Sequence, residues 1–386
     1  MPKLYIQPLT FAPSPQVVEG KDRMPGGVRL AGTMVYAREF AILIRSDSGP
    51  IISREIVRTE DLAAALARLP APLVEEGQRQ WSNLRMAHRP LELQLGSGEV
   101  RTIRLDQPQV MGILNVTPDS FSDGGQNSGM GGEVDVEAAV SRGVDMLEAG
   151  AAIIDIGGES TRPGAKVVWE GDEAKRVVPV IERLANGGAA VSVDTRKAAV
   201  MEAALEAGAR IVNDVSALSH DPRSAEVVAD AQVPVVLMHA PGTGDDLHAD
   251  ANYGNVVLDV FDALRERRDT AMAAGIRRDN IVLDPGIGFG KSVAENLALL
   301  NALPLFHALG QPLLLGVSRK RFIGALSKEA PADQRLAGSL AVATLAADMG
   351  VQMFRVHDAA ETMQAMHVWR GLRDGALTDF TQLPRD

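Results

Sequence analysis

The sequence has 386 residues, which fits one large domain plus a smaller unit. Hydrophobic residues make up 46% of it and charged residues 23%, as in a globular protein with a sizeable core. The formal net charge of −11 argues against general binding to nucleic acid or to an anionic membrane. Cysteine is absent, which excludes disulfides, thiolate zinc sites and thiol nucleophiles. Since neither a signal peptide nor a membrane-spanning apolar run is apparent, we expect a cytoplasmic protein.

The first 107 residues do not share the pattern of the rest of the chain. Residues 41–52 read as a hairpin, and residues 61–69 and 75–85 read as helices. A second hairpin is predicted over residues 91–105. Because it directly precedes the regular part of the chain, we expect it to plug one end of the main domain.

From residue 110 the chain repeats one unit, a short apolar run followed by a polar loop and an Ala/Leu-rich helical stretch. The apolar runs read as strands buried on both faces. They are residues 110–116, 152–158, 189–195, 210–217, 234–239, 280–286, 312–318 and 353–358. Helices are predicted at residues 133–149, 170–185, 197–207, 255–274, 335–349 and 359–373. Several of them end in a glycine, which is typical of a left-handed helix cap.

Eight such units in about 270 residues match the closed (β/α)₈ barrel, or TIM barrel. An open, doubly wound sheet is the alternative, but it usually has fewer strands and a phosphate loop after the first one. We therefore expect an α/β protein in which residues 88–386 form the barrel. Residues 1–87 are expected to be a small N-terminal α+β extension, to which no function can be given.

Polar or charged residues follow all eight predicted strands, where a barrel enzyme has its active site. Asp194, Asn213 and Asp284 can hydrogen-bond the edge of a heterocycle, although Asp194 alone could instead cap a helix. Asn115 is an oxygen ligand of the kind that Mg²⁺ accepts beside substrate phosphates, or an amide paired with loop backbone. The cations that suit a phosphate or pyrophosphate are Arg162, Lys320, Arg355 and His357.

Two other patterns are rejected as functional motifs. The segment 286–292 resembles a P-loop but is one residue short of the required spacing, and it follows the sixth strand. His239 and His248 could suggest a zinc pair, but the loop between them fixes no ligand geometry.

Met111–Gly125 and Gly157–Ala165 resemble the two signature motifs of bacterial dihydropteroate synthases. Shorter motifs at the other strands are similar to the family in the same order: Ser192–Thr195, Val212–Asp214, Leu283–Lys291, Gly316–Arg321 and Arg355–Asp358. The resemblance covers about residues 88–378. It implies a pterin-binding TIM-barrel transferase of folate biosynthesis. Such an enzyme condenses 6-hydroxymethyl-7,8-dihydropterin pyrophosphate with 4-aminobenzoate to give 7,8-dihydropteroate and pyrophosphate.

The resemblance also implies roles for individual residues. The pterin would be held by Asp194, Asn213, Met238, Asp284 and Lys320. The pyrophosphate would be held by Asn115, which would also bind Mg²⁺, and by Thr161, Arg162, Arg355 and His357. The aminobenzoate would contact Phe121, Asp123, Thr161, Pro163, Lys320 and Arg321. The catalytic residues would be Asp194, Lys320, Arg162 and Asp123.

Two positions depart from many members of the family. Arg321 stands where many of them carry a small hydroxyl residue, which leaves the carboxylate contact of the aminobenzoate open. Residues 240–246 differ from the glutamine- or arginine-containing segment of many relatives, and the role of this loop is open as well.

The chemistry of the site residues favours direct displacement of an S_N1 type. An arylamine is already a nucleophile, and none of the loops offers a Ser–His pair. Family resemblance and the Ala-rich segment 336–347 favour a homodimer through the last two β–α units. Because residues 284–291 lack the Phe-Gly insertion of sulfonamide-insensitive members, we expect a sulfonamide-sensitive enzyme.

Two other functions remain as alternatives. A pterin-binding methyltransferase that serves a corrinoid would share the barrel and the pterin pocket, but it would not need the cationic cluster. A catalytically idle pterin-binding or interaction protein would be expected to have lost some of the residues Asn115, Arg162, Lys320 and Arg355, and all four are present.

Overall fold

The computed structural model describes residues 2–12, 27–47, 49–117, 134–161, 164–165, 167–242, 246–249 and 252–377. Within these residues, eight parallel strands form one sheet in the order β12-β11-β10-β9-β8-β7-β14-β13. They are β7 (Gln109–Asn115), β8 (Ile153–Gly157), β9 (Val191–Asp194), β10 (Ile211–Asp214), β11 (Val235–Met238), β12 (Ile281–Asp284), β13 (Leu314–Leu315) and β14 (Met353–Val356). A parallel bridge between Leu283 and Leu313 joins the two ends of the sheet. The predicted TIM barrel is therefore confirmed.

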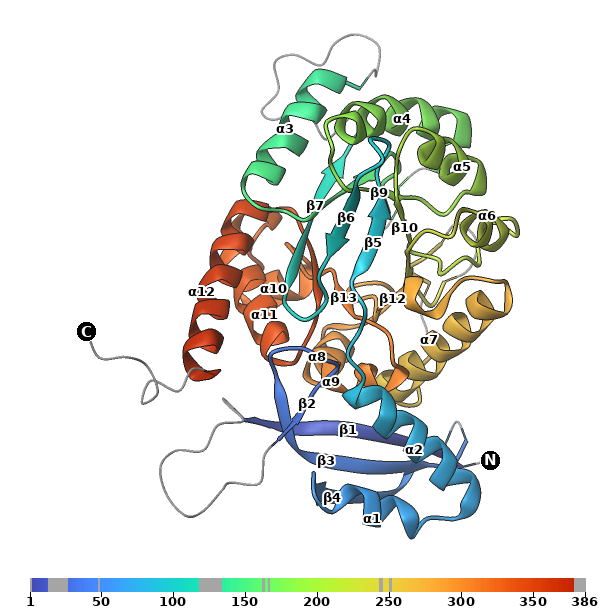
Figure 1. Cartoon of the computed structure of the whole chain (residues 1–386), viewed down its shortest axis with the longest axis vertical. Helices are drawn as coiled ribbons and strands as arrows, with labels where there is room; N and C mark the ends of the chain where they lie inside the picture. The colour runs from blue at the N-terminus through green and yellow to red at the C-terminus, as the bar shows by residue number, and fades with distance from the viewer. Residues whose placement is uncertain are drawn as a thin grey trace, which may run out of the picture.

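Helices surround the barrel on the outside (Figure 1). They are α3 (Val136–Glu148), α4 (Glu170–Asn186), α5 (Ala198–Glu206), α6 (Ser224–Ala231), α7 (Val256–Ala273), α8 (Val293–Asn301), α9 (Leu303–Phe306), α10 (Arg321–Leu326), α11 (Leu336–Asp348) and α12 (Ala359–Leu377), with 3₁₀ turns at Arg278–Asn280, His307–Leu309 and Ala332–Gln334. The six predicted helices are all present. Gly150 and Gly350 follow two of them with φ of 101° and 84°, the left-handed conformation that glycine allows without strain.

Seven of the eight predicted barrel strands are shorter than the sequence indicated, and two of them lose the most residues. The run 210–217 ends as β10 at Asp214 because the carboxylate of Asp214 accepts the backbone N–H groups of Ser216 (2.7 Å) and Leu218 (3.0 Å). These bonds turn the chain away from the sheet. The run 312–318 contributes only the two residues of β13 to the sheet, since the backbone beyond Leu315 already turns toward the active-site loop.

The hairpin of β5 (Leu91–Gln94) and β6 (Val100–Ile103) closes the amino-terminal end of the barrel, as predicted. Its side chains alternate, so that Leu91, Leu93 and Ile103 are buried while their neighbours face solvent. The buried ones pack against inward-facing barrel residues such as Met111 and Met353. Burial of a leucine side chain contributes roughly 1.5–3 kcal/mol, so the hairpin is a firmly seated plug.

The N-terminal extension is a four-stranded antiparallel sheet covered by two helices. Its elements are β1 (Lys3–Ala12), β2 (Val28–Arg29), β3 (Tyr36–Arg45), β4 (Ile51–Arg58), α1 (Leu62–Ala67) and α2 (Ala71–Arg85). The hairpin predicted at residues 41–52 is present, and its strands are longer than expected. Strand β1 was not predicted, because its partner is β3 and a pairing between distant segments leaves no local signal. The domain boundary at residue 87 stays a prediction.

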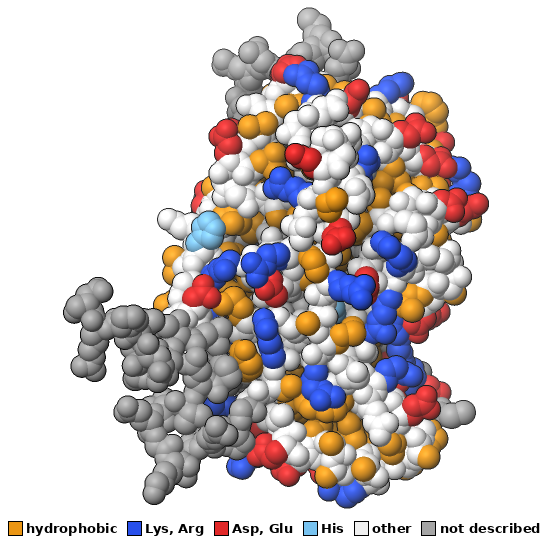
Figure 2. Space-filling view, in the orientation of Figure 1, with side chains coloured by type: hydrophobic (Ala, Val, Ile, Leu, Met, Phe, Trp, Pro, Cys, Tyr) orange, Lys and Arg blue, Asp and Glu red, His pale blue; other side chains and the backbone are white. Residues whose placement is uncertain are grey.

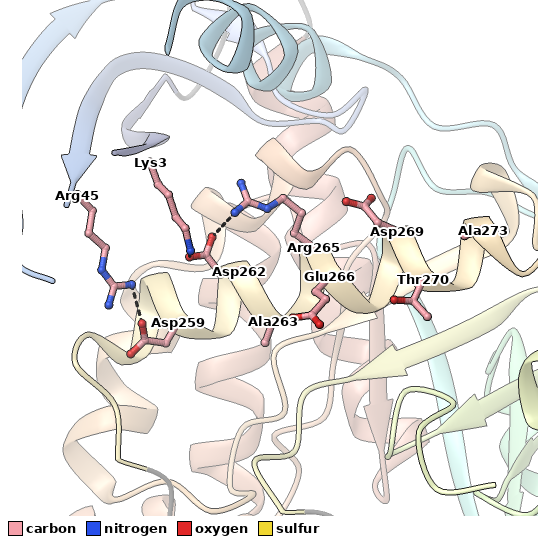
Figure 3. Close-up of a pocket in the computed structure, with 10 residues that line it drawn as sticks. All are labelled: Lys3, Arg45, Asp259, Asp262, Ala263, Arg265, Glu266, Asp269, Thr270 and Ala273. Carbon is pink, nitrogen blue, oxygen red and sulfur yellow. Dashed lines mark hydrogen bonds and ion pairs between the residues drawn. The ribbon is translucent and has the colours of Figure 1, made fainter. Parts of the chain in front are cut away.

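Charged contacts attach the extension to helix α7 of the barrel (Figure 3). Arg45, fully buried, lies 2.6 Å from Asp259, and Lys3 lies 2.8 Å from Asp262. The Tyr5 hydroxyl also donates to Asp262, at 3.0 Å. Lys3, Arg45, Asp259 and Asp262 line an open cleft of about 730 Å³ that contains none of the predicted site residues. The cleft therefore belongs to the contact between extension and barrel.

The surface carries charges of both signs. On the face shown in Figure 2, basic and acidic side chains are interspersed, with apolar side chains scattered among them. Of the helices in the described part of the chain, none combines the length and the apolar character that a membrane crossing requires.

Candidate active site

An ion-paired network lies inside the barrel where strands β8, β9, β10 and β14 end. Arg355 on β14 donates from Nε to Asp155 (2.6 Å) and from Nη2 to Asp194 (2.5 Å). Asn213 on β10 donates to the same oxygen of Asp155, at 3.0 Å. The strand register places Gly157, Asp194 and Asn213 side by side on neighbouring strands. Asp194 is therefore a member of the site rather than a helix cap, which answers the alternative left open by the sequence.

Asp155 is the residue of this network that the sequence analysis missed. It is fully buried, and its second oxygen Oδ1 has no hydrogen-bond partner among the described residues. The available signal was a single carboxylate within the apolar run Ile153–Gly157, which is costly unless the charge is paired. Arg355 meets that requirement.

Burial and mutual charge set the ionisation of the network. The pKa of Asp194 is raised to about 7, mainly by burial and also by the charges of Asp155, Glu173 and Asp214, against the lowering effect of Arg355. The carboxylates Asp194 and Asp155 raise the pKa of Arg355 despite its burial, so its guanidinium stays charged. An extra cation or a donor-rich ligand above this site would therefore be bound favourably.

Asp284 and Lys320 face the same mouth from β12 and from the loop after β13. Burial raises the pKa of Asp284, and its Oδ1 accepts the N–H of Gly286 at 2.7 Å. Burial also lowers the pKa of Lys320 to about 8, against the opposing effect of Asp284. Gly286 has φ of 68°, and a Cβ there would lie 1.8 Å from the carbonyl oxygen of His239. Only glycine lets these two loops approach so closely.

In the P-loop-like segment, the lysine that would contact phosphates in a true P-loop is instead hydrogen-bonded to backbone carbonyl oxygens. The ammonium of Lys291 donates to the carbonyl oxygens of Gly286 (2.8 Å), Phe289 (3.0 Å) and His239 (3.3 Å). Burial lowers the pKa of Lys291 to about 7. The segment is thus a rigid support for the mouth.

A small apolar wall stands beside these polar groups. Met238, Val215, Leu247 and Phe289 form a buried cluster of their own, separate from the main core. The ammonium of Lys320 lies 4.2 Å from the centroid of the Phe289 ring, a cation–π contact. The predicted pterin residues Asp194, Asn213, Met238, Asp284 and Lys320 are therefore brought to one mouth.

Three other residues predicted for the pyrophosphate, Asn115, Thr161 and His357, lie at or after the ends of strands. The register pairs Asn115 of β7 with Gly157 of β8, and the side chain of Asn115 has no hydrogen bond within the described residues. His357 lies beside the Ser318 hydroxyl, with Nδ1 at 3.1 Å, and burial lowers its pKa to about 4. This pKa favours a neutral His357 near pH 7, and its predicted contact with the pyrophosphate stays a prediction. Thr161 lies in the loop after β8.

Some predicted contacts are not placed at the mouth. Arg321 is exposed on the first turn of α10, directly after Lys320, and its predicted contact with the aminobenzoate stays a prediction. Phe121, Asp123, Arg162 and Pro163 lie outside the described residues.

Comparisons with known proteins agree with this geometry. The sequence profile of the pterin binding enzymes matches residues 111–357. The dihydropteroate synthase of Bacillus subtilis (strain 168) is 45% identical over 273 residues, which cover 69% of this chain and 91% of the relative. The N-terminal extension lies outside the profile match.

Solved structures show the same likeness. The dihydropteroate synthase of Xanthomonas albilineans with 4-aminobenzoic acid has 47% identity and a TM-score of 0.66, covering 76% of this chain and 100% of that one. The Yersinia pestis enzyme in complex with a sulfonamide drug has 42% identity and a TM-score of 0.66, covering 74% and 100%. The chain therefore belongs to the pterin binding enzymes and, within them, to the dihydropteroate synthases.

Proposed function

We propose that this chain condenses 6-hydroxymethyl-7,8-dihydropterin pyrophosphate with 4-aminobenzoate and releases 7,8-dihydropteroate and pyrophosphate. The observation that carries the assignment is the Asp155–Arg355–Asp194 network beside a separate apolar wall in the barrel of a dihydropteroate synthase. Carboxylates and an amide suit the amino and ring N–H groups of a pterin. Met238 in the apolar wall suits its flat face.

The reaction breaks the bond between the pterin methylene carbon and the pyrophosphate oxygen, and the electron pair leaves with the pyrophosphate. The resulting cation is delocalised into the pterin ring, where Asp194 supplies a countercharge. The aniline nitrogen of the aminobenzoate then forms the new carbon–nitrogen bond, and the proton it loses can pass to water. Arg355 and Lys320 are the described cations close enough to the mouth to neutralise charge on the departing group.

Mg²⁺ fits this site as a partner of Asn115. The Asn115 side-chain oxygen lies 3.7 Å from the position that a Cβ on Gly157 would take, next to the carboxylate of Asp194. The described residues hold no cluster of three or more acidic or histidine ligands, so such an ion would depend on substrate oxygens, as Mg²⁺ commonly does. When bound, Mg²⁺ would neutralise negative charge on the pyrophosphate.

We also propose a cytoplasmic homodimer that forms through α11 and α12, which pack side by side (Figure 1). Three large apolar side chains are exposed on these helices: Leu345 (59%), Val368 (60%) and Leu372 (71%). The small, exposed Ala341 on α11 would allow a second copy to approach closely. Exposed apolar groups that gather on one face are typical of an interface.

The test is release of pyrophosphate by the purified chain with and without 4-aminobenzoate, together with detection of 7,8-dihydropteroate by mass spectrometry. Release that requires aminobenzoate supports the proposal. Pterin binding without release would favour an inactive binding protein. Methyl transfer from a folate to a corrinoid would favour the methyltransferase.

A further inference from the structure

His248 follows residues 240–246, the segment after β11 whose role the sequence left open. Its ring stacks on Phe289 with centroids 4.9 Å apart and an interplanar angle of 10°. Its Nε2 lies 2.8 Å from the carbonyl oxygen of Thr161, in the loop after β8. A carbonyl oxygen only accepts, so Nε2 carries the hydrogen of this bond. One side chain thus joins three active-site loops.

We infer that His248 is a positioning residue that holds the loop after β8 in place for the second substrate. This inference rests on the proposed function, in which Thr161 borders the pyrophosphate and the aminobenzoate. In this role His248 acts through Thr161. Its effect should therefore fall on the binding of the aminobenzoate rather than on the binding of the pterin.

The base of the same loop is fixed independently. Glu159 accepts the N–H of Val168 at 2.8 Å, and the ammonium of Lys197 donates to the Val168 carbonyl oxygen at 2.6 Å. Lys197 also pairs with Glu159 (3.2 Å) and with the fully buried Glu173 (2.6 Å). Because these contacts close the loop at residues 159 and 168, the bond to His248 adds a restraint farther out, at Thr161. Loss of His248 should therefore loosen the loop without unfolding its base.

The platform beneath His248 connects it to the reacting centre. The Phe289 ring also carries the Lys320 ammonium, at 4.2 Å from its centroid. The Phe289 backbone is held in turn by Lys291. The segment before His248 is anchored as well, because the buried Leu247 packs in the apolar wall with Phe289. Phe289 and Leu247 are therefore held firmly, so that His248 has a fixed base from which to position Thr161.

Histidine meets both demands of this position, a flat ring for Phe289 and a donor for Thr161. The variant His248→Phe keeps the ring and loses the donor, whereas His248→Gln keeps a donor and loses the ring. His367→Phe, at an exposed histidine on α12, is the matched control.

The experiment uses the full chain and three readouts: steady-state kinetics, calorimetric binding of the pterin pyrophosphate, and hydrogen exchange of the peptide covering residues 158–168. For His248→Phe we expect about a fivefold rise in KM for 4-aminobenzoate, the effect of one hydrogen bond. The kcat and the pterin affinity should stay within twofold, and exchange in the peptide should be faster. His248→Gln should recover part of the KM, and the control should match the wild type.

Unchanged KM and unchanged exchange in His248→Phe would overturn the inference. An equal loss of pterin affinity, kcat and aminobenzoate affinity would also overturn it, because it would mean a general structural role. If the wild type does not turn over the two substrates, the proposed function fails instead. The exchange measurement on the free protein still tests the contact between His248 and Thr161 in that case.

Discussion

The ionisation of Asp194 and Lys320 predicts a narrow pH range for activity. The countercharge to the pterin cation requires Asp194 ionised, and its pKa lies at about 7, so activity should fall as the pH drops below that value. Lys320 must keep its proton, and its pKa lies at about 8, so activity should also fall above that value. With both groups required, kcat/KM for the pterin substrate should be about sevenfold lower at pH ~6 and pH ~9 than at pH ~7.5.

The pyrophosphate of the substrate also titrates near neutral pH. Variants are therefore needed to show whether the fall of kcat/KM at low pH, the acidic limb of the pH profile, is caused by Asp194 or by the substrate. Asp155 raises the pKa of Asp194, and Asp155→Asn should therefore move this limb to lower pH while the basic limb stays in place. Asp194→Asn should fold and lose most turnover at every pH. Pyrophosphate release measured from about pH 5 to 10 tests this, with thermal melting as the folding control. A limb near pH 7 that stays unmoved in Asp155→Asn would belong to the substrate and would refute the reasoning.

Three further predictions concern the metal, inhibition and assembly. Excess EDTA should abolish activity, and Asn115→Ala should raise the Mg²⁺ concentration needed for half-maximal rate; full activity in EDTA would contradict this. Sulfamethoxazole should compete with 4-aminobenzoate, since it shares the aniline ring, and an inhibition pattern other than competitive would exclude a shared pocket. Leu372→Arg should convert the dimer into a monomer in light scattering, because a charge would enter the apolar interface, whereas a monomeric wild type would refute the dimer.

The barrel could be predicted from sequence because each of its units is local. Apolar runs, helix caps and glycines such as Gly150 repeat within about 30 residues. Such short-range patterns can be recognised without knowing which strand or helix each element packs against. Strand β1 could not be found this way. It pairs with β3 across more than 20 residues of intervening chain, and nothing in its own composition records that partner.

The site residues that lie at the ends of strands could be predicted from the sequence. Asp194, Asn213 and Asp284 were identified because polar groups there face the mouth of a barrel. Asp155 was missed because it lies inside its strand and serves another side chain, Arg355. The contact of Arg321 with the aminobenzoate stays a prediction, because the structure shows only that this residue is exposed where α10 begins.

The two ends of the barrel depend on each other. The hairpin seals the lower end with leucines such as Leu93, in one cluster with Met111 and Met353. With water excluded from below, the Asp155–Arg355 pair above it lies in a medium of low dielectric, where charges interact strongly. That burial is the main cause of the raised pKa of Asp194, and it also makes a countercharge there effective against a developing cation. A polar substitution of Leu93 should thus lower the pKa of Asp194 and move the acidic limb of the pH profile to lower pH. It should also reduce the maximal kcat/KM, because the countercharge is weaker in a more polar medium, and the same pH series measures both effects.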